Sequence, residues 1–129
     1  MPVRVLVTVT APSVEAAEAS LAARVEACRL AESTEDGCLQ YEVFHSKVHP
    51  NRTVLCELWA SKEIYDKHWI LQQERQKKNP PPAPAPPKPG EPPQTVTVEF
   101  YEQQIYVRPE GIWIAADPAQ RSETIRWIK

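Results

Sequence analysis

Two titratable side chains, Glu57 and His68, are the residues of this chain that we expect to move a proton. Glu57 lies in a segment rich in aromatic and β-branched residues, which predicts a strand, and His68 lies on the helix predicted to follow it. Because that helix should pack beside the strand, we expect the carboxylate and the imidazole to be neighbours. A buried carboxylate favours its neutral form unless it is paired, so this pair could transfer protons near neutral pH. The alternative is a buried hydrogen bond that ties the helix to the strand.

Aromatic residues are predicted to surround this pair. The segments 38–47 and 53–59 flank a polar loop and predict a β-hairpin. If the loop is centred on Pro50, Tyr41 pairs with Trp59, and one face of the hairpin carries a mixed set of side chains: Leu39, Tyr41, Val43, His45, Leu55, Glu57 and Trp59. Such a mixture is typical of a cavity lining, and it predicts substrate-binding roles for four residues: Tyr41, His45, Trp59 and, from the helix, Trp69. Packing in a core or a dimer is the alternative for Tyr41, Trp59 and Trp69.

The opposite face of the hairpin is purely apolar and is expected to lie under helices. It carries Phe44, Val54, Cys56 and Leu58. Cys56 is interpreted as a small core residue because it alternates with Val54 and Leu58. The three cysteines of the chain are widely spaced and odd in number, so we expect reduced thiols rather than a disulfide framework or a zinc site.

The remaining elements predict an α+β fold. Alternating valines predict a strand over residues 3–10, and a helix capped by Ser13 should end near Glu32. A second helix begins at Ser61, where Ile64, His68, Leu71 and Arg75 form one stripe. A last strand is expected over residues 95–108, with a bulge or bend at 102–104. This order, βαββαβ, is that of a ferredoxin-like sheet, and the two helices can cover only one of its faces, so we expect a homodimer.

Proline marks the connection before the last strand. Nine of the 14 prolines fall between residues 80 and 93, a segment that cannot contribute regular hydrogen bonds to a helix or a sheet. We therefore divide the chain into a core over residues 1–78, a Pro-rich connector over 79–94, and a final strand with a C-terminal extension over 95–129. The connector is predicted to be exposed and extended; a ligand for an SH3-like domain is the alternative. After Arg108 the sequence allows a helix starting at Asp117 or a strand over 124–128.

Composition and motifs exclude several classes of function. The net charge of −2 arises from interspersed charges without a basic run, which disfavours nucleic-acid binding. No apolar stretch approaches the ~20 residues that span a bilayer, so we expect a cytoplasmic protein with no membrane partner. The sequence has no Gly-rich phosphate loop, no nucleophile elbow and no metal-ligand cluster. We therefore expect neither a cofactor nor a metal.

The segment from Glu35 to His68 also resembles a known family. Its Gly-Cys-Leu-x-Tyr-Glu-Val, the polar turn, Glu-Leu-Trp-x-Ser-x-Glu and the downstream His are similar to the antibiotic biosynthesis monooxygenase type of domain, a dimeric α/β barrel. The resemblance covers roughly residues 3–75. It implies a small homodimer whose cavity oxidises electron-rich aromatic compounds, quinols or anthrones, with molecular oxygen and no cofactor.

On this resemblance, His68 assisted by Glu57 would be the catalytic base. Tyr41 and Trp59 would stack on the substrate, and Trp69 would close the pocket. Two alternatives remain open at this point: an isomerase of the same fold, and a non-enzymatic dimeric module that binds a hydrophobic metabolite. The Pro-rich insertion and the C-terminal extension depart from the usual length of the family.

Overall fold

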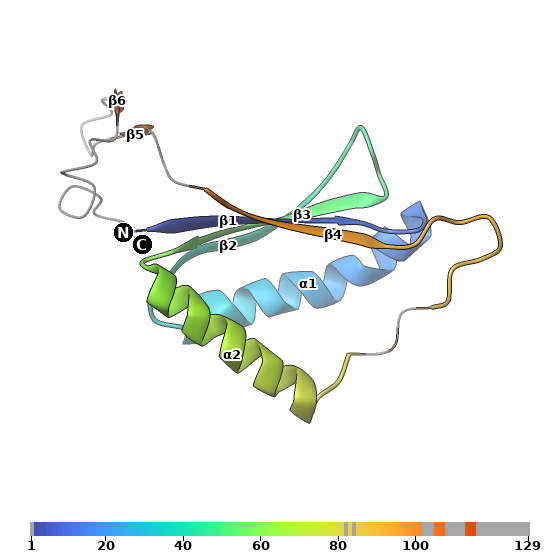
Figure 1. The fold of residues 1–129 in the computed structure, drawn as a ribbon, viewed down its shortest axis with the longest axis horizontal. Helices are drawn as coiled ribbons and strands as arrows, with labels where there is room; N and C mark the ends of the chain where they lie inside the picture. The colour runs from blue at the N-terminus through green and yellow to red at the C-terminus, as the bar shows by residue number, and fades with distance from the viewer. Residues whose placement is uncertain (1, 82, 84, 102–104, 108–112, 116–129) are drawn as a thin grey trace.

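The structure is a computed structural model that describes residues 2–81, 83, 85–101, 105–107 and 113–115, the last two segments by their backbone alone. The element order is β1 (Val3–Thr10), α1 (Val14–Thr34), β2 (Cys38–His45), β3 (Arg52–Trp59), α2 (Lys62–Lys78), β4 (Thr95–Tyr101), β5 (Ile105–Val107) and β6 (Trp113–Ala115). An antiparallel sheet has the strand order β2-β3-β1-β4, and both helices lie on one side of it (Figure 1). The predicted ferredoxin-like α+β fold is therefore confirmed.

Both helices begin at the predicted serines. The Ser13 hydroxyl accepts a hydrogen bond from the Ala16 amide at 3.1 Å, and the Ser61 hydroxyl accepts one from the Ile64 amide at 3.3 Å. These bonds satisfy amides that have no partner within the helix. Helix α1 ends at Thr34, slightly later than predicted, because the Glu35 amide still donates to the Ala31 carbonyl.

The predicted hairpin register is wrong by two residues. Tyr41 pairs with Glu57 and Val43 with Leu55, because the Arg52 amide donates to the His49 carbonyl and centres the hairpin on His49. A shift of two residues preserves the alternation of side chains, so the mixed face keeps its members over most of its length. A β-bulge between Cys38 and Gln40 changes the pattern at the start of β2, so that Cys38 rather than Leu39 is buried there.

The prediction of which face lies under the helices is also wrong. The mixed face packs against α1 and α2, where Tyr41 and Trp59 join Cys28 and Ala31 in the core. Phe44, on the opposite face, is 52% exposed. The mixed face carries the larger rings, so covering it removes more apolar surface from water. Alternation defines two faces but does not say which one the helices cover.

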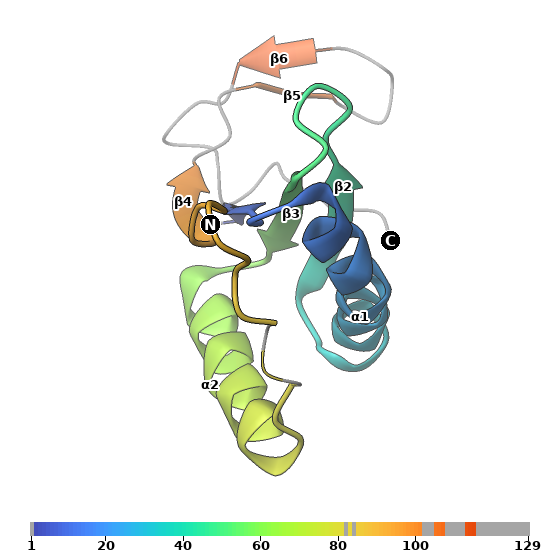
Figure 2. The ribbon, with the colours of Figure 1, turned by 90° about the vertical axis from the view of Figure 1, so that its right-hand side faces the viewer.

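The Pro-rich connector runs from the end of α2 around to β4 at the edge of the sheet (Figures 1 and 2). Its described residues are exposed, except that Glu91 is half-buried. Glu91 closes a turn in which its amide donates to the Lys88 carbonyl, and Gly90 adopts a φ of 86° that favours glycine. No helix within the described part of the chain is both long and apolar enough to span a membrane.

The predicted last strand corresponds to two strands, β4 and β5. The bulge expected at 102–104 lies outside the described residues, as do the helix or strand expected after residue 116. Strand β4 pairs with β1, whereas β5 and β6 pair with each other in a second, two-stranded sheet.

Candidate functional site

His68 anchors α2 to the sheet. It is the one buried residue of this helix, all of which the structure describes. Its ring lies against the indole of Trp59, with 4.3 Å between ring centroids, and 5.5 Å from the ring of Tyr41. The imidazole is therefore enclosed by aromatic rings, which hold its orientation by packing.

The carboxylate bonded to His68 is that of Glu35, not that of Glu57. The Nδ1 atom of His68 lies 2.6 Å from Oε2 of Glu35, and both side chains are more than nine-tenths buried. The other oxygen of Glu35 accepts a hydrogen bond of 2.6 Å from Nη1 of Arg75. Arg75 thus compensates the buried charge, and Glu35 fixes the imidazole from one side.

Local backbone structure positions Glu35. It is the residue that follows α1, and two residues later Gly37 turns the chain into β2 with a φ of 85°. The Gly37 carbonyl accepts a hydrogen bond of 2.9 Å from the Ala60 amide, which joins this turn to the start of α2. The tight turn therefore holds Glu35 beside the helix that carries His68 and Arg75.

Glu57 forms a second polar centre. Its Oε2 accepts a hydrogen bond of 2.8 Å from Nε1 of Trp59. Burial raises the pKa of Glu57 to about 7, although hydrogen bonds from Trp59 and Tyr41 lower it in part and the charge of Glu35 raises it further. Burial also raises the pKa of the Tyr41 hydroxyl, with Glu57 adding to the effect. Near neutral pH the Glu57 carboxyl is therefore neutral for part of the time.

A cavity of about 340 Å³ brings the two centres together between the sheet and α2. We call it the sheet cavity. It is lined by Val7, Tyr41, Leu55, Glu57, Tyr65, His68, Trp69, Gln72, Gln76, Val96 and Val98. The lining is mainly apolar with a few polar groups, as is usual for sites that bind small molecules.

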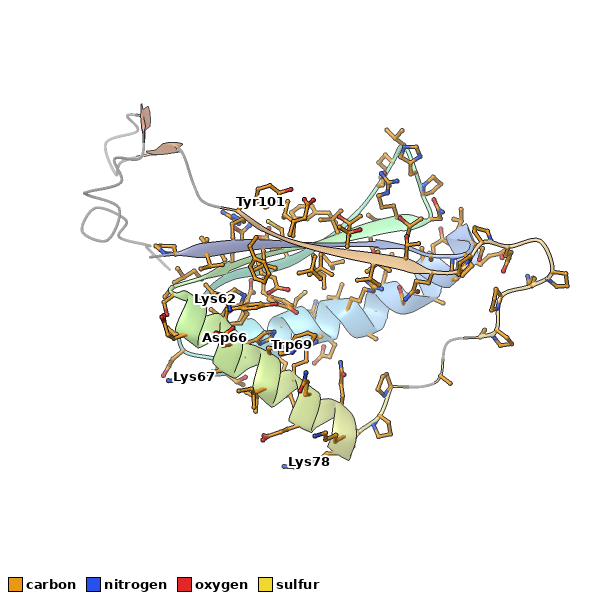
Figure 3. All side chains as sticks on the ribbon, viewed as in Figure 1. Lys62, Asp66, Lys67, Trp69, Lys78 and Tyr101 are labelled. Atoms are coloured by element: carbon orange, nitrogen blue, oxygen red, sulfur yellow. The ribbon has the colours of Figure 1, made fainter. Side chains whose placement is uncertain are left out.

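The other predicted ligand-binding residues lie at different places. Trp69 lines the sheet cavity and is half exposed, on the side of α2 that faces the sheet (Figure 3). Trp59 is fully buried and supports the His68 ring. His45 lies at the hairpin end of β2, where its Nε2 bonds to the Pro50 carbonyl, and it is not part of the cavity lining.

Sequence reasoning missed Glu35 as a functional residue. Two signals could have found it: Glu35 immediately precedes the turn at Asp36–Gly37, and Arg75 falls on the same helical stripe as His68. A carboxylate beside that stripe would connect the two basic side chains.

The arrangement can support a base that needs no metal. When Nδ1–H donates to the Glu35 carboxylate, the lone pair of the neutral imidazole is on Nε2, which is the arrangement that orients a catalytic histidine. Within the described residues, no hydrogen bond involves Nε2. No group of three or more metal-ligating side chains is found in the same part of the chain.

Comparison with known proteins places the fold. The sequence model of the antibiotic biosynthesis monooxygenase family matches residues 2–69. A Deinococcus radiodurans structure named for that family shares 22% identity over 78% of this chain and 90% of its own, with a TM-score of 0.54. A Bacteroides thetaiotaomicron protein of unknown function, described as a possible oxidoreductase, shares 17% identity over 78% and 95%, with a TM-score of 0.55. No curated protein matches the chain significantly.

Proposed function

The chain belongs to the antibiotic biosynthesis monooxygenase family, and we propose that it oxidises a small aromatic compound, a quinol or an anthrone, with molecular oxygen and no cofactor. Membership of the family supports a monooxygenase-like function in general. The observation that carries the finer proposal is the bond from His68 to the buried Glu35, at the wall of a cavity that also holds Glu57.

In this proposal His68 is the catalytic base. Its Nε2 removes the proton from the acidic C–H or O–H group of the substrate, and the imidazolium is stabilised by the Glu35 carboxylate. Glu35 does not touch the substrate, so it is a positioning residue. The earlier expectation that Glu57 assists His68 directly is replaced, because the partner of Nδ1 is Glu35.

Glu57 has a different role in the proposed reaction. A carboxyl group that is neutral near pH 7 can donate a hydrogen bond to a substrate oxygen on which negative charge develops. In an anthrone, this oxygen is the carbonyl oxygen. It becomes an enolate oxygen when the CH2 carbon on the opposite side of the central ring loses a proton. Tyr41 and Trp69 provide aromatic walls for the ring system.

The overall reaction balances without a cofactor. Loss of the proton leaves a carbanion that reduces oxygen and combines with it to give a peroxide anion, which takes the proton back from the imidazolium of His68 to form a hydroperoxide. The peroxide then loses water and leaves a new carbonyl group, so an anthrone and one oxygen molecule yield an anthraquinone and one water molecule. Both oxygen atoms of O₂ are accounted for, one in the quinone and one in water.

The proposal includes a homodimer formed through the face of the sheet that points away from the helices. Phe44 and Tyr101 are 52% and 46% exposed, and Figure 3 shows Tyr101 on that side of the sheet. Leu6 and Val54 lie on the same face by strand alternation. An exposed apolar group of this kind on a sheet favours association with a second subunit.

The test is oxygen consumption with 1,8-dihydroxyanthrone as substrate, comparing the wild type with the His68→Phe variant. Phe keeps a ring against Trp59 but removes the base, so we expect the rate to fall by ~10²-fold or more. His49→Phe, at an exposed position of the hairpin loop, is the matched control and should keep the wild-type rate.

Circular dichroism and light scattering must show that His68→Phe is folded in the same oligomeric state. Oxidation that persists in a folded His68→Phe protein would remove His68 from the mechanism. If the wild type binds the product quinone but does not accelerate oxygen uptake, the non-enzymatic binding module becomes the better description.

A further inference from the structure

A second cavity lies on the other side of His68, between the two helices. It has a volume of about 370 Å³ and is lined by Ala27, Leu30, His68, Gln72, Arg75, Gln76, Asn79 and Pro81. We call it the interhelix groove. His68, Gln72 and Gln76 line both this groove and the sheet cavity, so the two spaces are neighbours along the same side of α2.

The polarity of α2 is unusual for a helix that packs on a sheet. A helix normally turns its apolar stripe toward the core and its polar residues toward water. Beyond His68, this part of the chain lines the groove with Gln72 and Arg75, which are half-buried, and with Gln76 and Asn79, which are exposed, whereas Ile70 is 58% exposed. Gln72 is therefore a half-buried amide on the side of α2 that an apolar stripe would ordinarily occupy.

The amides of Gln72 and Gln76 have unused hydrogen-bonding capacity. Within the part of the chain that the structure describes, neither side chain makes a hydrogen bond. Each amide offers two donors and one carbonyl acceptor, and so can bind a hydroxyl or a carbonyl oxygen. Gln72 follows His68 by one helical turn, which places their Cβ atoms about 5 to 6 Å apart. Gln76 follows His68 by two turns, which is about 12 Å along the helix axis.

The charge in the groove favours a neutral ligand group. Arg75 is the cationic side chain of the lining, and its guanidinium already bonds to Glu35 and lies 3.5 Å from the Thr34 hydroxyl. A ligand carboxylate would have to compete with Glu35 for it. The opposite wall, Ala27 and Leu30, is apolar and suits a ring edge.

We infer that the interhelix groove is the second half of one extended binding site, in which Gln72 and Gln76 bind a hydroxyl or carbonyl group at the far end of an aromatic ligand. This inference rests on the proposed function, because the near end of the ligand is the group that reacts at His68. It assigns the specificity of the site to an oxygen substituent remote from the reacting atom.

The experiment is calorimetric titration with 2,6-dihydroxynaphthalene and with 2-naphthol, which lacks the second hydroxyl. We expect the second hydroxyl to improve binding to the wild type by about fivefold to tenfold, the range for one or two hydrogen bonds. In Gln72→Leu combined with Gln76→Leu, that advantage should disappear, so that the two compounds bind to the variant with equal affinity. Gln73→Leu is the matched control, because Gln73 lies on the same helix and lines neither cavity.

A nitrogen-15 spectrum of the side-chain amides gives a direct readout. The NH₂ signals of Gln72 and Gln76 should shift on addition of 2,6-dihydroxynaphthalene, and that of Gln73 should not. The inference is overturned if the wild type shows no advantage for the second hydroxyl, or if the double variant keeps it. These results are independent of oxygen uptake, so a protein that binds as expected but does not oxidise 1,8-dihydroxyanthrone refutes the proposed function alone.

Discussion

Replacing Glu57 with Gln should change how the stability of the protein depends on pH. Glu57 is 4% exposed, and the pKa of its carboxyl group is raised from the ordinary value of 4.5 to about 7, chiefly by burial. The folded state therefore holds this proton more tightly than the unfolded state does. Between the two values the folded state binds this proton more fully, so the contribution of Glu57 to the free energy of unfolding falls as the pH rises through this window.

The magnitude follows from the size of the pKa shift. Each pKa unit corresponds to about 1.4 kcal/mol, so Glu57 should remove about 3 kcal/mol of stability by the time the pH exceeds its pKa in the folded state. Gln is neutral at every pH and still offers a carbonyl oxygen to Nε1 of Trp59. The variant should therefore lose about 3 kcal/mol less than the wild type between about pH 4 and about pH 8.

Urea unfolding followed by tryptophan fluorescence, at several pH values across this range, gives the required free energies. The difference between variant and wild type cancels the other titrating groups that both proteins share. Glu42→Gln, at an exposed position of the neighbouring strand, controls for the loss of one negative charge. If the wild type and Glu57→Gln give parallel curves with equal m values, the carboxyl group is not held in its neutral form, and the reasoning fails.

Three further changes test the site and the assembly. Glu35→Gln should lower the rate of 1,8-dihydroxyanthrone oxidation by ~10²-fold or more in a folded protein, because the amide no longer fixes the tautomer of His68. Gly37→Ala should cost about 1 to 3 kcal/mol in urea unfolding, because an added Cβ meets Cδ1 of Ile64 at 2.6 Å at a φ of 85°. Phe44→Glu should convert the proposed dimer to a monomer in light scattering, because it adds a charge to the exposed sheet face.

Each of these changes has a control within the chain. Asp36→Asn alters the exposed carboxylate next to Glu35 and should leave oxidation near the wild-type rate. Gly90 has a similar φ of 86° with open space around it, so Gly90→Ala isolates the backbone strain and should cost less than Gly37→Ala. Val48→Glu, at an 81% exposed loop position, should not affect assembly. Equal effects of a change and its control would contradict the reason given for that change.

The fold could be predicted from the sequence because its signals are local. Alternating valines, the serine caps and the helical stripes each depend on neighbours within a few residues, and β1, α1 and α2 begin where these signals place them. The hairpin register depends on one turn, and a hydrogen bond to His49 was enough to shift it by two residues. Which face the helices cover depends on the total area that is buried, and the periodicity of the sequence gives no information about that area.

The candidate site could be predicted only in part, because only some of its residues lie on faces that local patterns define. His68 and Glu57 were found because both fall on faces that local patterns define, and both line the sheet cavity. The partner of His68 is 33 residues away in the chain and lies in a turn, where no periodic pattern operates. A contact of that kind follows from the packing of the turn after α1 against α2, and a single sequence does not specify it.

The position of β1 in the sheet has a consequence for synthesis of the protein. Strand β1 lies between β3 and β4, and its Val9 pairs with Thr53 on one side and with Val96 on the other. During translation one edge of β1 therefore stays without its native partner until β4 has left the ribosome, after the whole Pro-rich connector. An open edge strand of alternating valines can pair with other chains. Slow emergence of the connector would prolong that interval, so aggregation of nascent chains should respond to the speed at which this segment is translated.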